Sequence, residues 1–120
     1  MLPQERSKLA RYVELFNARE FDAIRRMLVE DVKLELVGKL EASGIQSVRN
    51  YFRDYDGKYD WRLVPGLVDG RLAALVCDPL GDLPAPEYFV VVQWSGDKIV
   101  GIRDFRYARC VVDAAPLSAC

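Results

Sequence analysis

The sequence contains no histidine. This absence excludes serine–histidine and cysteine–histidine catalysis, and it removes both the commonest metal ligand and the side chain that titrates near neutral pH. The cysteines are Cys77, Cys110 and Cys120, and their spacing matches neither a zinc-binding nor a redox motif. Unpaired cysteines usually behave as small apolar residues. We therefore predict no metal site and no cofactor.

The sequence also lacks an excess of one charge and lacks long apolar runs. Lys and Arg number 17, Asp and Glu number 18, and the formal net charge is −1. A nucleic-acid-binding surface needs clustered positive charge, and a membrane span needs roughly 20 apolar residues in a row. The longest apolar runs, such as Tyr88–Val92, are far shorter, and no apolar core of a secretory signal follows Met1. We expect a cytoplasmic protein that binds neither nucleic acid nor membranes.

Helical periodicity fills the first half of the chain, and strand-like segments follow. Apolar residues recur at helical spacing in Pro3–Asn17, in Phe21–Leu28 and from Ile45 to Tyr55. Strands are predicted at 32–37, 61–68, 71–77, 87–94 and 98–112, with two-residue hairpin signals at 69–70 and 96–97. This order predicts one α+β domain over residues 1–113, in which three N-terminal helices pack on a curved, mostly antiparallel sheet. Residues 114–120 are expected to fray.

The stretch GIRDFRYAR, at 101–109, carries charged side chains within a strand-like pattern. Alternation along a strand would place Ile102, Asp104 and Arg106 on one face. The opposite face would carry arginines and aromatics, namely Arg103, Phe105, Tyr107 and Arg109. These residue types are enriched in interface cores. We therefore predict a homodimer that forms through the Phe105 and Tyr107 face.

Three passages resemble a known superfamily. Residues 11–36, RYVELFNAREFDAIRRMLVEDVKLEL, are similar to the opening of the ketosteroid isomerases. Residues 51–79 and 88–109 resemble the SnoaL-like domain at the C-terminal end of some bacterial extracytoplasmic-function sigma factors. The resemblance is to the SnoaL-like, nuclear transport factor-like superfamily. It implies a cone in which three helices close over a strongly bent sheet around an internal pocket, and sheets that commonly pair back to back as dimers.

The resemblance also implies which residues face the pocket. Tyr12 falls where the isomerases hold the substrate oxygen, but the positions of their two acids read Leu36 and Val90. Asp104 resembles the last-strand aspartate of limonene-type epoxide hydrolases, although residues 91–93 lack the arginine–aspartate partner that these enzymes need. Both catalytic sets are incomplete, so Asp104 is the one candidate catalytic residue. The candidate ligand-binding residues are Tyr12, Tyr55, Trp61, Tyr88, Ile102 and Arg106.

Three interpretations of Asp104 and Arg106 remain open. The two side chains can form a structural ion pair, anchor a ligand, or take part in proton transfer with Asp104 as general base. A neighbouring arginine favours the charged carboxylate, which suits an anchor better than a base. The predicted function is a small-molecule-binding or regulatory domain with an apolar pocket for a small apolar or aromatic molecule. The alternative is a small cyclase or isomerase that uses Asp104 as its base.

Overall fold

The structure, a computed structural model, describes residues 3–58, 60–79, 86–114 and 117–119. The described helices are α1 (Pro3–Asn17), α2 (Phe21–Arg25), α3 (Ile45–Asp56) and α4 (Arg109–Ala114). The described strands are β1 (Leu28–Leu36), β2 (Leu40–Ser43), β3 (Arg62–Val68), β4 (Arg71–Cys77), β5 (Pro86–Ser95), β6 (Lys98–Asp104) and β7 (Leu117–Ala119). None of these helices is long and apolar enough to cross a bilayer.

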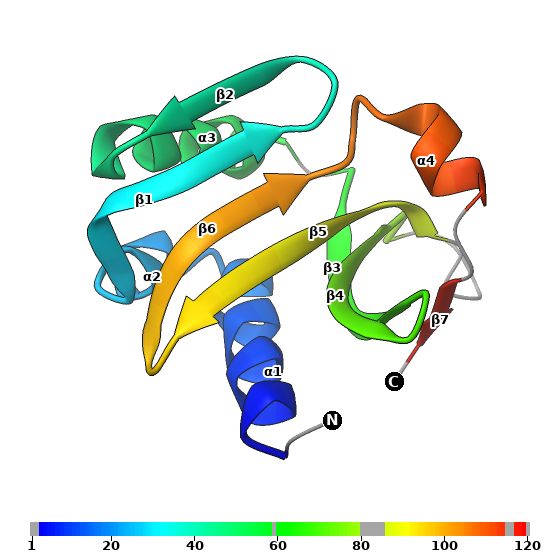
Figure 1. The fold of residues 1–120 in the computed structure, drawn as a ribbon, viewed down its shortest axis with the longest axis horizontal. Coiled ribbons are helices and arrows are strands. Elements are labelled where there is room, and N and C mark those ends of the chain that lie inside the picture. Colours follow the sequence, from blue (N-terminus) through cyan, green and yellow to red (C-terminus); the bar gives the residue numbers. More distant parts are fainter. Residues whose placement is uncertain (1–2, 59, 80–85, 115–116, 120) are drawn as a thin grey trace.

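All the described strands belong to one sheet, in the order β2-β1-β6-β5-β4-β3-β7. β1 and β6 run parallel, and every other neighbouring pair is antiparallel. The sheet bends around α1, which contacts β3 and β4, and around α3, which contacts β1 and β2 (Figure 1). The predicted α+β class, with helices on a curved and mostly antiparallel sheet, is confirmed.

The two predicted hairpins form at the predicted residues. Asp69 and Gly70 both have positive φ, 50° and 77°, as the turn that best matches strand twist requires. Gly96 also has positive φ, 59°, between the paired residues Ser95 and Lys98. Local turn chemistry therefore sets the β3–β4 and β5–β6 registers.

Two side chains fasten the helices to one another and to the sheet. The Asn17 side chain exchanges two 2.8 Å hydrogen bonds with the backbone of Leu63, donating to its carbonyl and accepting from its N–H. Arg19 has positive φ two residues after the end of α1, and its guanidinium donates to the carbonyls of Tyr55, Asp56 and Lys58. Positive charge at the C-terminus of a helix is favourable. These contacts fix the end of α3, and Tyr55 with it.

The first half of the chain departs from the prediction at one helix end and one strand. The second helix ends at Arg25 and does not reach Leu28, because Leu28 already pairs with Ile99 as the first residue of β1. β1 therefore starts four residues before the predicted strand at 32–37. β2, which pairs with β1 after the Gly38 turn, has no counterpart in the prediction.

The last predicted strand, 98–112, is wrong beyond Asp104. The Asp104 side chain accepts a 2.8 Å hydrogen bond from the N–H of Arg106, two residues on, and this local turn takes the chain away from the sheet. Phe105 is consequently buried, 8% exposed, with its ring centroid 4.4 Å from that of Phe89. Tyr107 is 46% exposed, and Arg109 begins α4. The predicted Phe105 and Tyr107 sheet face therefore does not exist as one surface.

The end of the chain is also different from the expected frayed tail at 114–120. Leu117–Ala119 form β7, which pairs antiparallel with Gly66, Leu67 and Val68 of β3. Residues 115, 116 and 120 lie outside the described residues. A single domain that ends at residue 113 stays a prediction.

Candidate functional site: a buried carboxylate among tyrosines

Asp104, at the C-terminal end of β6, is the one charged side chain that is buried among the described residues, with 1% of its surface exposed. Oδ2 accepts hydrogen bonds from the hydroxyls of Tyr51, at 2.8 Å, and Tyr55, at 2.7 Å. Oδ1 accepts from the N–H of Arg106 at 2.8 Å. A carboxylate is costly to bury unless hydrogen bonds replace its water. Three protein donors do so here.

A third tyrosine extends this network. The hydroxyl oxygens of Tyr55 and Tyr88 lie 2.7 Å apart. A hydroxyl has one proton to donate, and Tyr55 gives its proton to Asp104, so Tyr88 must donate to Tyr55. Donation therefore runs from Tyr88 through Tyr55 to Asp104, where Tyr51 donates as well. Successive hydrogen bonds of this kind polarise one another.

Helical and strand spacing explain why these groups meet. Tyr51 and Tyr55 are four residues apart in α3 and so share one face, with ring centroids 5.2 Å apart. In the sheet, Asp104 of β6 pairs with Val90 of β5, and Tyr88 lies two residues before Val90 on the same side of the sheet. The α3 face and the inner side of β5 and β6 therefore converge on one carboxylate.

Tyr12 lies in the same interior without a partner. Its side chain is 0% exposed, and its hydroxyl has no hydrogen-bond partner among the described residues. A buried, unsatisfied hydroxyl is unfavourable, and such groups mark places where a water or a ligand atom can bind. Tyr12 is thus a buried polar group that remains available beside the Asp104 network.

The environment keeps these tyrosines protonated. Burial raises the pKa of Tyr12, Tyr51, Tyr55 and Tyr88 above the usual value, and the negative charge of Asp104 raises it further. For Tyr88, whose hydrogen bond with Tyr55 acts in the opposite direction, the pKa is raised to about 12. All four hydroxyls are therefore neutral donors at neutral pH.

Arg106 does not form the side-chain ion pair that strand alternation predicts. No ion pair between described residues joins Asp104 to Arg106. The backbone N–H of Arg106 contacts the carboxylate, whereas its guanidinium lies 6.0 Å from the Tyr88 ring centroid and 5.9 Å from that of Tyr107. The turn after Asp104 is the reason, since it removes Arg106 from the strand.

The remaining predicted residues are buried, and one participant was missed. Trp61 donates from its indole N–H to the Tyr55 carbonyl at 2.9 Å, and the Arg19 guanidinium lies 4.7 Å from the Trp61 ring centroid. Trp61 therefore positions Tyr55. Ile102 lies in the core. Tyr51 is absent from the predicted site, although its four-residue spacing from Tyr55 is the signal that could have found it.

The free volume beside Asp104 is small. One cavity of about 50 Å³ lies on the Tyr51 and Asp104 side of Tyr55, and a second of about 50 Å³ lies on the Tyr88 side. Tyr55, Lys58 and Arg106 line both. Pockets for drug-sized ligands measure roughly 300–1,000 Å³. The apolar pocket that the sequence predicts is therefore largely occupied by aromatic side chains beside Asp104, and the space there suits small groups.

In the part of the chain that the structure describes, no group of three or more Cys, Asp or Glu side chains could hold a metal ion. The three groups that contact the Asp104 carboxylate, the Tyr51 and Tyr55 hydroxyls and the Arg106 N–H, all donate to it.

Comparisons with known proteins identify the fold. No protein-family model matches the sequence, and no curated protein matches it. Among solved structures, SalBIII, an epoxide hydrolase/cyclase-like enzyme with a role in pyran ring formation in the polyether salinomycin, is 26% identical, covering 85% of this chain and 90% of SalBIII, with a TM-score of 0.57. A protein of the SnoaL-like family from Agrobacterium tumefaciens is 17% identical, covering 87% of this chain and 97% of its own, with a TM-score of 0.62.

An LEH-like epoxide hydrolase from M. tuberculosis is 17% identical, covering 82% of this chain and 78% of its own, with a TM-score of 0.60. Shared fold at such identity does not carry shared activity. The bent sheet, the helices across its inner face and these similar structures agree: the chain has the SnoaL-like, nuclear transport factor-like fold, the fold of polyketide cyclases, isomerases and epoxide hydrolases.

Proposed function

We propose that this chain is a small-molecule-binding or regulatory domain whose ligand approaches Asp104 between Lys58 and Arg106. The observation that carries the proposal is the buried Asp104 carboxylate, whose donors adjoin two small cavities with a shared set of lining residues. Binding sites usually combine a few convergent polar groups with apolar walls, and here the polar groups lie at the edge of the apolar core.

Binding agrees with the geometry better than proton transfer does. A general base must come within hydrogen-bond distance of the proton that it removes. Both oxygens of Asp104 already accept hydrogen bonds from Tyr51, Tyr55 and Arg106, and the adjacent cavity of about 50 Å³ is too small for a ring-forming substrate. A ligand that leaves these hydrogen bonds intact would instead contact the residues at the edge of the two cavities, Lys58 and Arg106, which we call the rim.

The rim favours a ligand with an acceptor oxygen and an aromatic body. Each cavity has acidic lining residues, Asp60 and Glu87 in one and Asp54 and Asp104 in the other. Lys58 and Arg106 are the cationic residues that line both, so a carboxylate, phenol or carbonyl oxygen can bind between these two. The rings of Tyr88 and Tyr107, close to the Arg106 guanidinium, offer faces for an aromatic group. A small aromatic acid has both features.

The sequence resemblance to the accessory domain of sigma factors supports a regulatory role in this proposal. In such a role, the ligand would alter how this domain contacts a protein partner, without direct binding to DNA. The alternative function, a small cyclase or isomerase with Asp104 as base, is supported by the likeness to SalBIII and by the placement of a buried carboxylate at the site. It requires Tyr51 or Tyr55 to release Asp104.

Benzoate is a suitable probe for this site. We expect benzoate to shift the NMR signals of Tyr88 and Arg106 in a saturable manner, and we expect Arg106→Gln to weaken binding about two- to fivefold, the effect of losing an exposed ion pair. Arg62→Gln, which removes an exposed arginine from β3, is the matched control and should leave binding unchanged. A native mass spectrum of the untagged protein measures the mass of any ligand that the purified protein already carries. Absence of both a benzoate shift and a carried ligand would refute the proposal.

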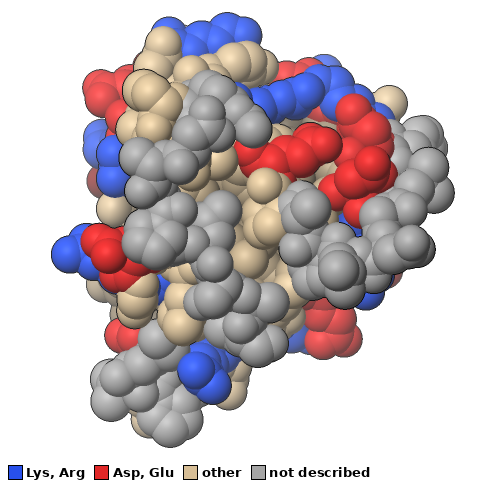
Figure 2. Space-filling model, turned by 90° about the vertical axis from the view of Figure 1, so that its right-hand side faces the viewer, with Lys and Arg blue, Asp and Glu red and all other residues tan. Residues whose placement is uncertain are grey.

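We also propose a homodimer, formed through the outer side of the sheet beside α4. A groove of about 750 Å³ lies there, with β4, β5 and β6 as its floor. Figure 2 shows the side of the molecule that carries α4, which is on the right in Figure 1; uncharged described residues are exposed there beside charged ones. Asp69 and Arg71 both line the groove, and a two-fold interface can pair opposite charges of two copies.

Sedimentation at micromolar concentration tests the dimer. Val91→Lys places a charge on the groove floor and is expected to give monomers. Leu40→Lys changes a residue that is 52% exposed on β2, away from the groove, and should leave the dimer intact. A monomeric wild-type protein would show that the prediction is wrong.

A further inference from the structure

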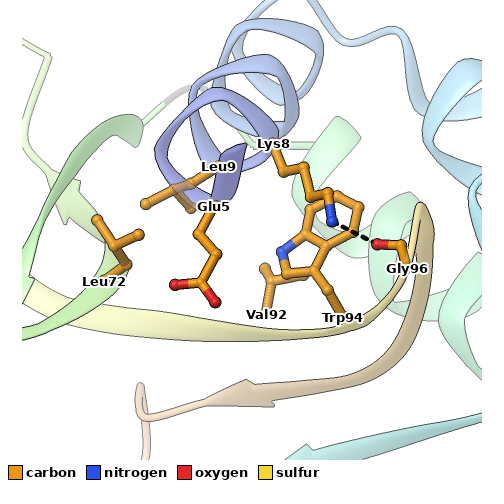
Figure 3. A pocket seen from close by; sticks show the side chains of 7 residues that line it. All are labelled: Glu5, Lys8, Leu9, Leu72, Val92, Trp94 and Gly96. Carbon is orange, nitrogen blue, oxygen red and sulfur yellow. Dashed lines mark hydrogen bonds between the residues drawn. The ribbon is translucent and has the colours of Figure 1, made fainter. Parts of the chain in front are cut away.

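A pocket of about 360 Å³ lies on the inner side of the sheet, at the opposite end of β5 from Tyr88. Figure 3 shows its walls: Glu5, Lys8 and Leu9 from α1, Leu72 from β4, Val92 and Trp94 from β5, and Gly96 from the following turn. This volume falls within the range of small-molecule pockets. The open space on this side of the sheet is therefore larger beside Trp94 than beside Asp104.

The charged groups of this pocket differ in how they are engaged. The Lys8 ammonium donates to the Gly96 carbonyl and lies 5.9 Å from the Trp94 ring centroid. Glu5, three residues earlier in α1, has the spacing for a helical ion pair with Lys8, but no ion pair joins Glu5 to another described residue. In Figure 3 the Glu5 side chain extends toward the sheet between Leu72 and Trp94. The pocket therefore has an unused carboxylate and an occupied cation position.

The position of Lys8 shows which charge the pocket favours. An indole face attracts cations more strongly than other rings do, and a backbone carbonyl accepts from an ammonium. Lys8 uses both of these groups as an internal cation. Leu9, Leu72 and Val92 supply apolar walls beside them, which suit the hydrocarbon part of a ligand. An anionic ligand would meet one cation, the Lys8 ammonium, which already binds the Gly96 carbonyl and the Trp94 face, and it would also meet the Glu5 carboxylate.

We propose that this pocket binds an organic amine, with its ammonium between Glu5 and the Trp94 ring and its apolar part against Leu72 and Val92. In binding, the ligand ammonium competes with Lys8 for the Trp94 face and the Gly96 carbonyl. Lys8 thus acts as a tethered competitor that the ligand displaces toward solvent.

The competition gives a test in which two variants of one helix act in opposite directions. With phenethylamine as the probe and the Trp94 indole N–H signal as the NMR readout, Glu5→Gln is expected to weaken binding about two- to fivefold. Lys8→Met is expected to tighten binding by a similar factor, since it removes the competing cation. Glu14→Gln, on the exposed side of the same helix, is the matched control and should have no effect. The Trp94→Phe variant lacks the Trp94 indole N–H signal, and so its spectrum distinguishes that signal from the one of Trp61.

Phenylpropionate, which has a similar shape and the opposite charge, is the matched ligand control. Tighter binding of phenylpropionate than of phenethylamine, or weaker binding of the amine by Lys8→Met, would overturn the proposal and indicate an anion site. A Trp94 signal that phenethylamine leaves unshifted at tens of millimolar would overturn it as well. The Tyr88 signals report separately on the Asp104 site, so the two sites are tested independently.

Discussion

Replacing Asp104 with alanine is expected to lower the free energy of unfolding by on the order of 3 kcal/mol or more, because each buried donor left without an acceptor costs about 1–3 kcal/mol. The hydroxyls of Tyr51 and Tyr55 and the N–H of Arg106 all lose their acceptor together. Asp104→Asn retains one carbonyl oxygen and is expected to cost less. Urea unfolding followed by the fluorescence of Trp61 and Trp94 measures both variants.

Matched variants separate this network effect from the loss of any carboxylate. Asp31→Ala, which removes an exposed aspartate from β1, should stay within about 0.5 kcal/mol of wild type. Tyr51→Phe is expected to be destabilising in the wild type but neutral or stabilising beside Asp104→Ala, since it then removes an unsatisfied hydroxyl. Equal effects of Tyr51→Phe in both backgrounds would contradict the hydrogen bond that the structure shows.

Local patterns were sufficient for much of the fold. The helical spacing of Leu9, Val13 and Phe16 predicted α1, and Asp69–Gly70 predicted a hairpin whose two positive φ angles the structure contains. These features depend on neighbours within a few residues along the chain, so periodicity and turn chemistry report them directly. The bent sheet and the helices above it followed from the order of the elements and from the resemblance to a superfamily.

Features that depend on side-chain competition or on volume were not predictable in this way. Asp104 ends β6 because its own carboxylate captures the Arg106 N–H, and an alternating pattern continues through residue 112 regardless. β2 is mostly exposed, so it has no apolar alternation to reveal it. Sequence placed Tyr12, Tyr55 and Tyr88 at one site, but whether their rings leave a pocket or fill it depends on packing in three dimensions.

The filled interior leads to a second large effect, an abrupt loss of stability in alkali. Burial is the main cause of the raised pKa of Tyr12, Tyr51, Tyr55 and Tyr88, whereas tyrosines of an unfolded chain ionise near pH 10. Below pH 10 both states keep these protons, so the four side chains add no pH dependence. Above pH 10 the unfolded chain releases protons that the folded protein retains, and stability falls as pH rises.

The size of this effect is comparable with the whole stability of a small domain. Each fully retained proton lowers the free energy of unfolding by about 1.4 kcal/mol per pH unit. Because the tyrosines of the unfolded chain are only partly ionised near pH 10, four of them lower it by about 4 kcal/mol between pH 10 and 11. The decline continues toward the folded-state pKa values, of which that of Tyr88 is about 12. Domains of this size are typically stable by about 5–15 kcal/mol. We therefore expect unfolding and tyrosine ionisation to occur together, measured by circular dichroism and tyrosinate absorbance on the same samples.

Tyr12→Phe and Tyr51→Phe then distinguish ionisation from hydrogen bonding. Each variant removes one titrating group, so each should make the alkaline transition less steep by one proton. Because the Tyr12 hydroxyl has no partner among the described residues, Tyr12→Phe should leave stability at neutral pH unchanged or raised. Tyr51→Phe loses its hydrogen bond to Asp104 and should lower the stability at neutral pH.

Gradual tyrosine ionisation near pH 10 with an intact dichroism spectrum would contradict the burial of these four tyrosines. A Tyr12→Phe protein that is less stable at neutral pH would place a hydrogen-bonded water on Tyr12, within reach of the Asp104 site.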